Sequence, residues 1–250
     1  IFALITAAGL ILIIILGLTT EPSKPIDYFE MPNGSTGIIL AFVLIFFAFI
    51  GFEDMANVAE EVKRPHKTIP RAIILSVVIT GVIYILVSLS VVRVLNWEEL
   101  SLSSAPLADV AKNVLGTNGS ITLSLIALFA TASTVLITLV AGARILYGMA
   151  KSNSLPLFLS KIHSKTKTPW IAVIGILIAS VGFAFVGDIV VVANITVFAV
   201  VITFAVINLA VIVLRYTEPE LERPFRVPVN IRKFPILPLF GFATTVYMAL

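Results

Sequence analysis

The stretch FFAFIGFEDMANVAEEVKRP, residues 46–65, places two carboxylates directly after a long apolar run. The clean apolar part of that run, residues 37–52, is about 24 Å long as a helix, whereas the hydrocarbon core of a bilayer is about 30 Å thick. A helix that completes the crossing takes Glu53 and Asp54 with it, and a carboxylate at that depth costs at least about 2.5 kcal/mol unless it faces a protein interior or a wet cavity. The alternative is a span that ends at Gly51, with both acids among the lipid headgroups.

Composition places the chain in the membrane class. Of its 250 residues, 59% are apolar and 12% are charged, with a mean hydropathy of +1.09, whereas a soluble domain is about a quarter charged. Too few charges remain for a water-soluble surface, so we expect an integral membrane protein. The chain has no cysteine, which excludes thiolate chemistry within it. The formal net charge of +3 is better explained by basic loops on one side of a membrane than by nucleic acid binding.

Seven apolar windows predict membrane-spanning helices, because about 20 apolar residues are needed to cross the hydrocarbon core. They cover roughly residues 1–18, 37–59, 70–92, 119–147, 169–187, 189–214 and 234–250. Thr68 and Pro70 are expected at the start of the third window. Both ends of the chain lie within apolar runs, so we expect it to be part of a longer protein.

The basic residues divide unevenly between the loops that join these windows. Loops 60–71, 144–168 and 215–233 hold 14 lysines and arginines, against 3 on the opposite side. The positive-inside rule therefore predicts that these three loops are cytoplasmic. In the opposite, outer loop, residues 104–116 have their apolar side chains on one face and predict a short amphipathic helix, with Ser104 as its cap.

A helix break at Gly51 would create a binding site from backbone atoms. Glycine weakens a helix, and the ends of two half-helices leave carbonyls and amides without intrahelical partners. Carbonyls around Phe47, Ala48 and Ile50 would carry partial negative charge, and the amides of the second half partial positive charge. Such a site suits a zwitterion, and transporters place substrate sites at breaks of this kind near the membrane midplane.

Three stretches of the sequence resemble motifs of one family, the amino-acid/polyamine/organocation permeases. Residues 46–73, which end in VKRPHKTIPRAI, resemble the sixth membrane helix of that family and the loop after it. Residues 141–156, AGARILYGMAKSNSLP, are similar to the end of its eighth helix, and residues 214–228, LRYTEPELERPFRVP, to the loop after its tenth. The order and spacing of the three motifs extend the resemblance over essentially the whole chain.

The resemblance implies an all-α integral membrane protein with a leucine-transporter-type fold, a helical bundle of two inverted five-helix repeats with extra helices. The chain would then be a fragment that lacks the first four helices. Residues 1–18 would end the first repeat, and residues 37–214 would form the second, with its broken helix at 37–59. Residues 215–250 would hold a cytoplasmic loop and the start of a further transmembrane helix.

The resemblance also implies roles for residues around the break. Phe47 matches the aromatic residue that covers bound substrate from outside. The carbonyls of Phe47, Ala48 and Ile50, next to Gly51, match the ligands of the substrate ammonium group. Glu53 matches the acidic residue that senses or carries the proton in some members.

The resemblance also concerns residues outside the broken helix. Thr138 aligns with a position on the eighth helix of the family that contacts the substrate side chain. Near the place where some proton-coupled members carry a lysine, this chain has Thr6, and residues 1–18 contain no lysine or arginine. Thr6, Ser133 and Thr134 supply hydroxyl oxygens, which suit a hard cation such as Na⁺, although such hydroxyls more often bond to backbone or to neighbouring helices.

The sequence therefore predicts a secondary active transporter of the plasma membrane that moves amino acids by alternating access, coupled to protons. The alternatives are an amino acid sensor on the same fold, sodium coupling, and exchange. A membrane enzyme is disfavoured, because the sequence lacks a Gly-x-Ser-x-Gly elbow, His/Asp clusters and a cysteine nucleophile. The expected partners are an amino acid, protons and the lipid bilayer, with no cofactor and no nucleic acid.

Overall fold

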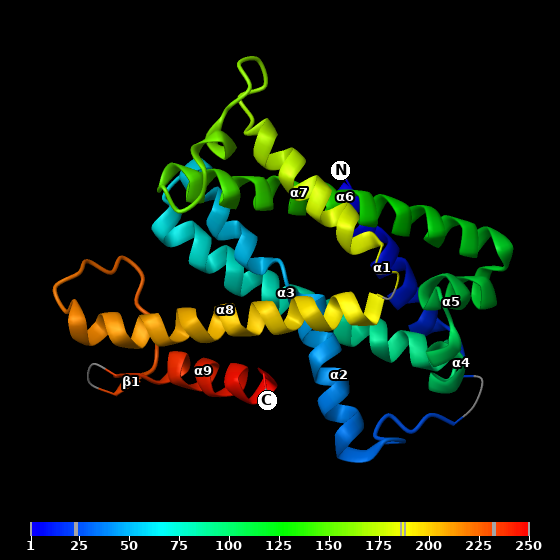
Figure 1. Ribbon diagram of the computed structural model, residues 1–250. Coiled ribbons are helices and arrows are strands. Elements are labelled where there is room, and N and C mark those ends of the chain that lie inside the picture. The colour runs from blue at the N-terminus through cyan, green and yellow to red at the C-terminus, as the bar shows by residue number, and fades with distance from the viewer. Residues whose placement is uncertain (1, 23–24, 186, 188, 232–233, 250) are drawn as a thin grey trace. The chain divides into compact units, whose positions relative to one another are not determined.

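The computed structural model describes residues 2–22, 25–185, 187, 189–231 and 234–249. Its regular structure is helical apart from one short hairpin (Figure 1). The chain divides into two compact units, Ile1–Glu30 with Ser76–Leu177 and Met31–Leu75 with Ile178–Leu250. Two helices, α3 and α7, pass from one unit to the other, so each unit is described separately.

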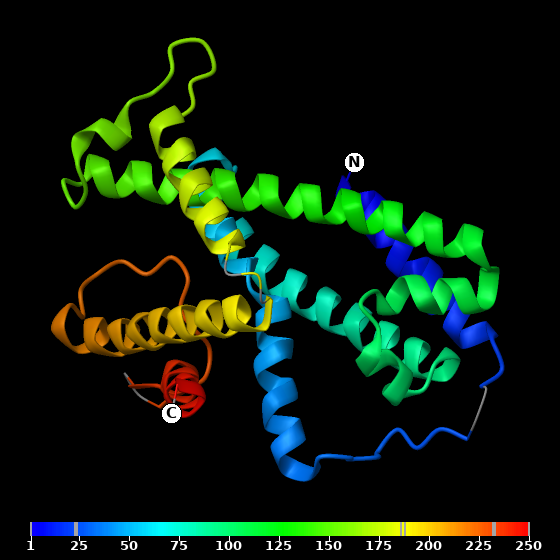
Figure 2. The same cartoon turned by 45° about the vertical axis from the view of Figure 1, so that its right-hand side comes forward.

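In the first unit, helices α1 and α5 pack against the long helix α6 and against each other. Its elements are α1 (Phe2–Thr19), most of α3 (Pro65–Val94), α4 (Trp97–Leu102), α5 (Pro106–Leu115), α6 (Thr117–Lys151), η2 (Leu157–Ser160) and most of α7 (Trp170–Ala184). Figure 2 shows α5 beside α1 and the first turns of α6. The buried core joins four helices through Ile13, Val91, Val110 and Leu123.

Helices α1 and α3 approach closely where glycine leaves room. A Cβ atom built on Gly17 would lie 2.4 Å from the carbonyl oxygen of Ser90, so only glycine fits at this crossing. The Ser90 hydroxyl donates to the Leu86 carbonyl at 2.7 Å. Arg93 then donates from Nε to the Gly17 carbonyl at 3.1 Å and from a terminal nitrogen to the Thr20 carbonyl at 3.4 Å. The guanidinium thereby satisfies carbonyls that the end of α1 leaves without intrahelical partners.

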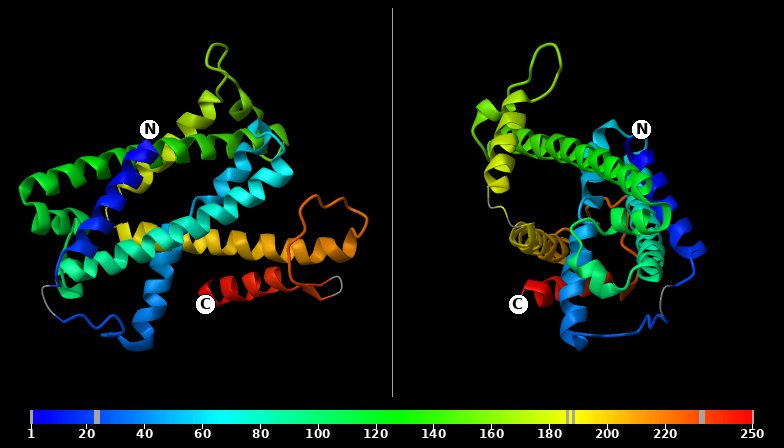
Figure 3. Two further views of the ribbon diagram at one scale, coloured as in Figure 1. Left: turned by 180° about the vertical axis from the view of Figure 1, so that it is seen from behind. Right: turned by 90° about the vertical axis from the view of Figure 1, so that its right-hand side faces the viewer.

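The second unit contains the broken helix and the pair α8 and α9. Its elements are α2 (Gly34–Phe49), the 3₁₀ helix η1 (Phe52–Glu61), the start of α3, the end of α7, α8 (Ile189–Thr217), β1 (Asn230–Ile231), β2 (Phe234–Pro235) and α9 (Ile236–Ala249). Helices α8 and α9 lie side by side in Figures 1 and 3. The strands pair antiparallel, with Asn230 opposite Pro235.

The loop between α8 and β1, drawn in orange in Figure 3, is organised by Arg223. Its guanidinium donates to the carbonyls of Leu214 at 2.9 Å and Glu218 at 2.7 Å, in the last turn of α8 and just beyond it. Further bonds reach the carbonyls of Pro219 and Leu221. A cation in this position is favoured by the negative end of the helix dipole, so the loop folds back onto the helix that precedes it.

The apolar helices account for the predicted spans. Among the described residues, five helical stretches are long and apolar enough to cross a membrane. They are Phe2–Thr19, Gly34–Ala59, Pro65–Val94, Thr117–Lys151 and Val191–Thr217, and the shorter apolar helices are Trp170–Ala184 and Ile236–Ala249. Large apolar side chains point outward, for example Leu4 and Leu128, which are 75% and 66% exposed. The expectation of an all-α membrane protein is therefore confirmed, whereas the inverted repeat stays a prediction.

Helix α3 begins earlier than the sequence predicted. It starts at Pro65 instead of near Thr68, and Pro70 lies inside it. Proline is well suited to a first helical position, because its fixed φ matches the helix and its missing N–H has no partner there anyway. The Thr68 hydroxyl donates to the Lys63 carbonyl at 3.0 Å, a bond that reaches back across the start of the helix.

The outer helix within residues 104–116 is α5, and its start is organised by Ser103 instead of Ser104. The Ser103 hydroxyl accepts the N–H of Ala105 at 3.0 Å and donates to the Asp109 carboxylate. The short helix α4 was not expected. It is capped by the side chain of Asn96, which accepts the N–H of Glu99 at 2.8 Å, a spacing typical of a capping box.

Candidate functional site

The apolar span predicted over residues 37–59 is interrupted at Ile50 and Gly51. Helix α2 ends at Phe49, and the Ile50 N–H donates to the Phe47 carbonyl at 3.2 Å in a tightened last turn. Ile50 is extended, with φ −58° and ψ 137°, and Gly51 follows at φ 117° and ψ −12°. An L-residue rarely adopts the backbone conformation of Gly51, so the glycine makes this change of direction possible. The chain then continues as η1.

Glu53 turns back onto the break. Its Oε2 atom accepts the N–H of Gly51 at 2.9 Å. Gly51 caps the N-terminus of η1, where backbone N–H groups lack intrahelical partners, and the carboxylate supplies one. The N–H of Asp54 donates to the Gly51 carbonyl at 3.2 Å and begins the hydrogen bonding of η1. The Asp54 carboxylate accepts from the side-chain amide of Asn57 at 3.2 Å. The two neighbouring carboxylates therefore differ in their contacts, because only the Glu53 side chain bonds to the glycine of the break.

The predicted substrate-binding residues of the broken span lie within residues 47–51, at the end of α2 and just beyond it. Phe47 is 37% exposed, Ala48 and Gly51 are exposed, and Ile50 is partly buried. The Phe47 carbonyl already accepts the Ile50 N–H, and Ala48 also has an interaction partner. No hydrogen bond to the Ile50 carbonyl occurs within the described ranges. A helix C-terminus presents partial negative charge, so the carbonyls here are suited to a cation such as an ammonium group.

The remaining predicted residues belong to the first unit. Thr138 lies exposed on α6. The Thr6 hydroxyl donates to the Phe2 carbonyl at 3.1 Å, and the Thr134 hydroxyl donates to the Ala130 carbonyl at 3.1 Å. Both hydroxyls therefore bond back to their own helices, as hydroxyls in membrane helices commonly do. The sodium site that these two residues would form with Ser133 stays a prediction.

Aromatic packing around the break was not predicted from the sequence. Phe204 of α8 lies with its ring centroid 6.1 Å from that of Phe46 and 5.9 Å from that of Phe52. Phe46 precedes the break and Phe52 follows it. Since Phe204 lies within a long apolar run like many other residues of α8, the sequence offered no signal that would single it out.

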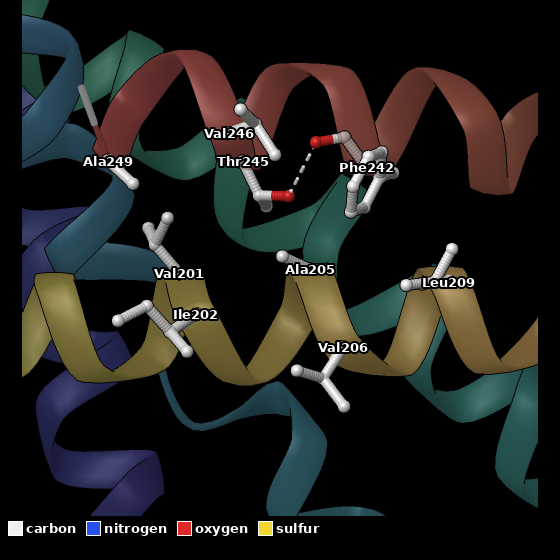
Figure 4. Close-up of a pocket in the computed structure, with 9 residues that line it drawn as sticks. All are labelled: Val201, Ile202, Ala205, Val206, Leu209, Phe242, Thr245, Val246 and Ala249. Atoms are coloured by element: carbon white, nitrogen blue, oxygen red, sulfur yellow. Dashed lines mark hydrogen bonds between the residues drawn. The ribbon is translucent and has the colours of Figure 1, made fainter.

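A separate recess between α8 and α9 does not contain the predicted substrate residues. Its volume is about 210 Å³, and Figure 4 shows the side chains around it, from Val201 to Leu209 on one helix and from Phe242 to Ala249 on the other. The only polar side chain drawn there is Thr245, whose hydroxyl donates to the carbonyls of Gly241 and Phe242 at 2.9 Å. An apolar recess whose hydroxyl is already bonded is unsuited to a zwitterion.

Several apolar spans, one of them broken at a glycine beside a carboxylate, define a multi-pass membrane protein. Comparison with known families gives the particular assignment. The chain matches the family described as amino acid permease over residues 1–250, and it belongs to that family. The resemblance to the amino-acid/polyamine/organocation permeases is thereby confirmed, and the family is one of permeases and not of enzymes.

Individual relatives are identical to this chain at about one aligned residue in three. The methylthioribose transporter of Bacillus subtilis (strain 168) is 32% identical over 247 residues, which cover 96% of this chain and 51% of the relative. The branched-chain amino acid permease BcaP of the same organism is 32% identical over 203 residues, 79% of this chain and 43% of the relative. The human cystine/glutamate transporter is 32% identical over 213 residues, 85% of this chain and 42% of the relative. The chain spans about half the length of these curated relatives.

Proposed function

We propose that the chain is part of a secondary active transporter that moves amino acids across the plasma membrane by alternating access, with the break between α2 and η1 as its substrate site. The observation that carries the proposal is the geometry at Gly51. A left-handed glycine interrupts an apolar span, and the Glu53 carboxylate accepts the glycine N–H at 2.9 Å. Family membership supports transport, since the relatives named above are permeases and transporters.

The substrate ammonium is placed at the carbonyl end of α2. Phe47, Ala48 and Ile50 supply the carbonyls, and the partial negative charge of a helix C-terminus favours a cation there. Phe47 is exposed enough to cover the substrate from outside. The side chains of Phe47, Ala48 and Phe49 carry no charge, which favours an amino acid with a neutral side chain.

Proton coupling is assigned to Glu53. Its carboxylate bonds to the backbone at the hinge of the broken span, so gain of a proton would change a contact that holds the break. Asp54 has its own partner, Asn57, and is assigned no part in coupling. The proposed orientation places loops 60–71, 144–168 and 215–233 in the cytoplasm, because they hold most of the basic residues.

A second candidate substrate class follows from the methylthioribose transporter, which matches 96% of this chain. Methylthioribose is a thioether sugar without an ammonium group. If this chain carried such a substrate, the carbonyls at the end of α2 would accept hydroxyl hydrogen bonds instead of binding a cation. The two substrate classes therefore differ in the group that occupies the same carbonyls.

Uptake into liposomes tests the proposal. The full-length protein is reconstituted, and uptake of radiolabelled leucine, glutamate, arginine and methylthioribose is measured with and without an outside-acid pH gradient. We expect leucine uptake that the gradient stimulates and that sodium leaves unchanged. Binding of amino acids without uptake would instead indicate a sensor. Stimulation by sodium would favour the hydroxyl site at Thr6, Ser133 and Thr134, and uptake that requires internal amino acid would indicate exchange.

A further inference from the structure

Phe204 of α8 packs against aromatic rings on both sides of the break. Its ring meets that of Phe46 nearly edge-on, with an interplanar angle of 79°, and that of Phe52 at 48°. Edge-to-face and tilted geometries are the favourable ones for aromatic pairs, because the positive ring edge meets the negative face. Phe46 lies in the last turn of α2, and Phe52 is the first residue of η1. One side chain therefore contacts both halves of the broken span.

The backbone at the break is suited to pivoting. The Ile50 N–H bond to Phe47 belongs to the end of α2, and the Asp54 N–H bond to Gly51 belongs to the start of η1. At Gly51 itself, the position that a Cβ would occupy is open, since a Cβ built there would meet no atom within 4 Å. The angle between α2 and η1 therefore depends on side-chain contacts, which include the Glu53 bond to the Gly51 N–H and the packing of Phe204 against Phe46 and Phe52.

The backbone at Phe204 is held by Asn208, which packs against α9. The side-chain amide of Asn208 donates to the Phe204 carbonyl at 2.8 Å. Asn208 in turn lies tightly against α9, where a Cβ on Gly241 would come within 2.8 Å of its Oδ1 atom. The close pair α8 and α9 thus forms the support from which Phe204 reaches the break.

We propose that Phe204 is a positioning residue that clasps the two halves of the broken span and fixes the angle between α2 and η1 in the resting state. Loss of the ring would release η1 and allow the site to sample other geometries. A binding-competent state that is less populated lowers the apparent affinity by the same fraction. This consequence for transport rests on the proposed function, whereas the clasp itself does not.

Thiol labelling tests the clasp directly. The chain has no cysteine, so Val58→Cys, at a partly buried position of η1, provides a single reporter in it, with any cysteines elsewhere in the full-length protein replaced. The variants are Phe204→Leu, which removes the ring but keeps apolar volume, and Phe204→Tyr, which keeps the ring. Phe198→Leu is the matched control, because Phe198 lies on the same helix and is 54% exposed. Phe46→Leu removes a partner ring and serves as the second test if Phe204→Leu does not fold.

Without substrate, we expect Phe204→Leu to raise the rate of maleimide labelling about fivefold, as loss of an aromatic pair would allow, and Phe198→Leu and Phe204→Tyr to leave it unchanged. In uptake assays, Phe204→Leu should raise KM more than it lowers kcat. Equal labelling of the Phe204→Leu and Phe198→Leu proteins would overturn the clasp. If labelling differs but the parent protein takes up no amino acid, the clasp stands and the proposed transport function is wrong.

Discussion

Replacing Gly51 with alanine is expected to reduce uptake by about five- to 150-fold, because the strain of a non-glycine residue at this backbone conformation costs about 1–3 kcal/mol and each 1.4 kcal/mol is a factor of ten. The space around Gly51 is open, so the added methyl group meets no atom within 4 Å and the effect is conformational and not steric. The backbone relieves the strain by leaving φ 117°, which changes the direction of η1 and the carbonyls at the end of α2. The measurement is the initial rate of leucine uptake in proteoliposomes.

Two other glycines provide matched controls for this prediction. Gly116→Ala introduces strain at another positive φ, 73°, in the first unit and also meets no atom within 4 Å. Gly148→Ala adds a methyl group into open space on α6 without a positive φ. We expect both variants to retain most of the uptake per folded molecule, with the folded fraction measured by size-exclusion chromatography. A Gly116→Ala protein as inactive as the Gly51→Ala protein would show that strain alone, without the break, explains the loss.

Glu53→Gln is expected to abolish the stimulation of uptake by an outside-acid gradient while leaving uptake driven by a substrate gradient within about threefold of the parent protein. Glutamine keeps the length of the side chain and an oxygen that can accept the Gly51 N–H, but it cannot carry the proton. Glu53→Ala removes both functions and should impair both kinds of uptake. The ratio of uptake with the pH gradient to uptake without it is the quantity to measure.

Asp54→Asn is the control for Glu53→Gln, since it neutralises the adjacent carboxylate. Asp54 accepts from Asn57 and is not bonded through its side chain to Gly51, so this variant should keep its response to the gradient. A Glu53→Gln protein that still responds fully to the gradient would show that Glu53 is not the proton carrier. Loss of the response in both variants would mean that the acidic pair, and not Glu53 alone, carries it.

The membrane spans could be predicted from the sequence, because the thickness of the bilayer requires long apolar runs that are visible in it. Span positions follow from runs of apolar residues, because a helix needs about 20 predominantly apolar residues to cross the hydrocarbon core. The interruption of the second span was expected from the short apolar length before Glu53 together with Gly51, and the structure ends α2 at Phe49. The resemblance of residues 46–73 supplied the family, which the match over the whole chain confirms.

The features that sequence reasoning missed depend on tertiary contacts or on a choice between similar local signals. Phe204 is one aromatic residue in an apolar helix, and only the fold brings it to Phe46 and Phe52. Ser103 and Ser104 are equivalent as caps in the sequence, but only Ser103 is bonded to Asp109. The hydrogen bond from Gly51 to Glu53 spans two residues, yet it depends on a side-chain conformation that no residue pattern specifies.

The central claim is that the carbonyls at the end of α2 bind the ammonium group of an amino acid, and competition with matched analogues tests it most directly. Inhibition of radiolabelled leucine uptake by the full-length protein is measured with unlabelled leucine, with 4-methylpentanoate, which lacks only the ammonium group, and with methylthioribose. A helix C-terminus that binds a cation predicts strong inhibition by leucine and at least about a hundredfold weaker inhibition by 4-methylpentanoate, because carbonyls desolvated for the ammonium would be left unpaired. Equal inhibition by leucine and 4-methylpentanoate, or stronger inhibition by methylthioribose than by leucine, would contradict the claim.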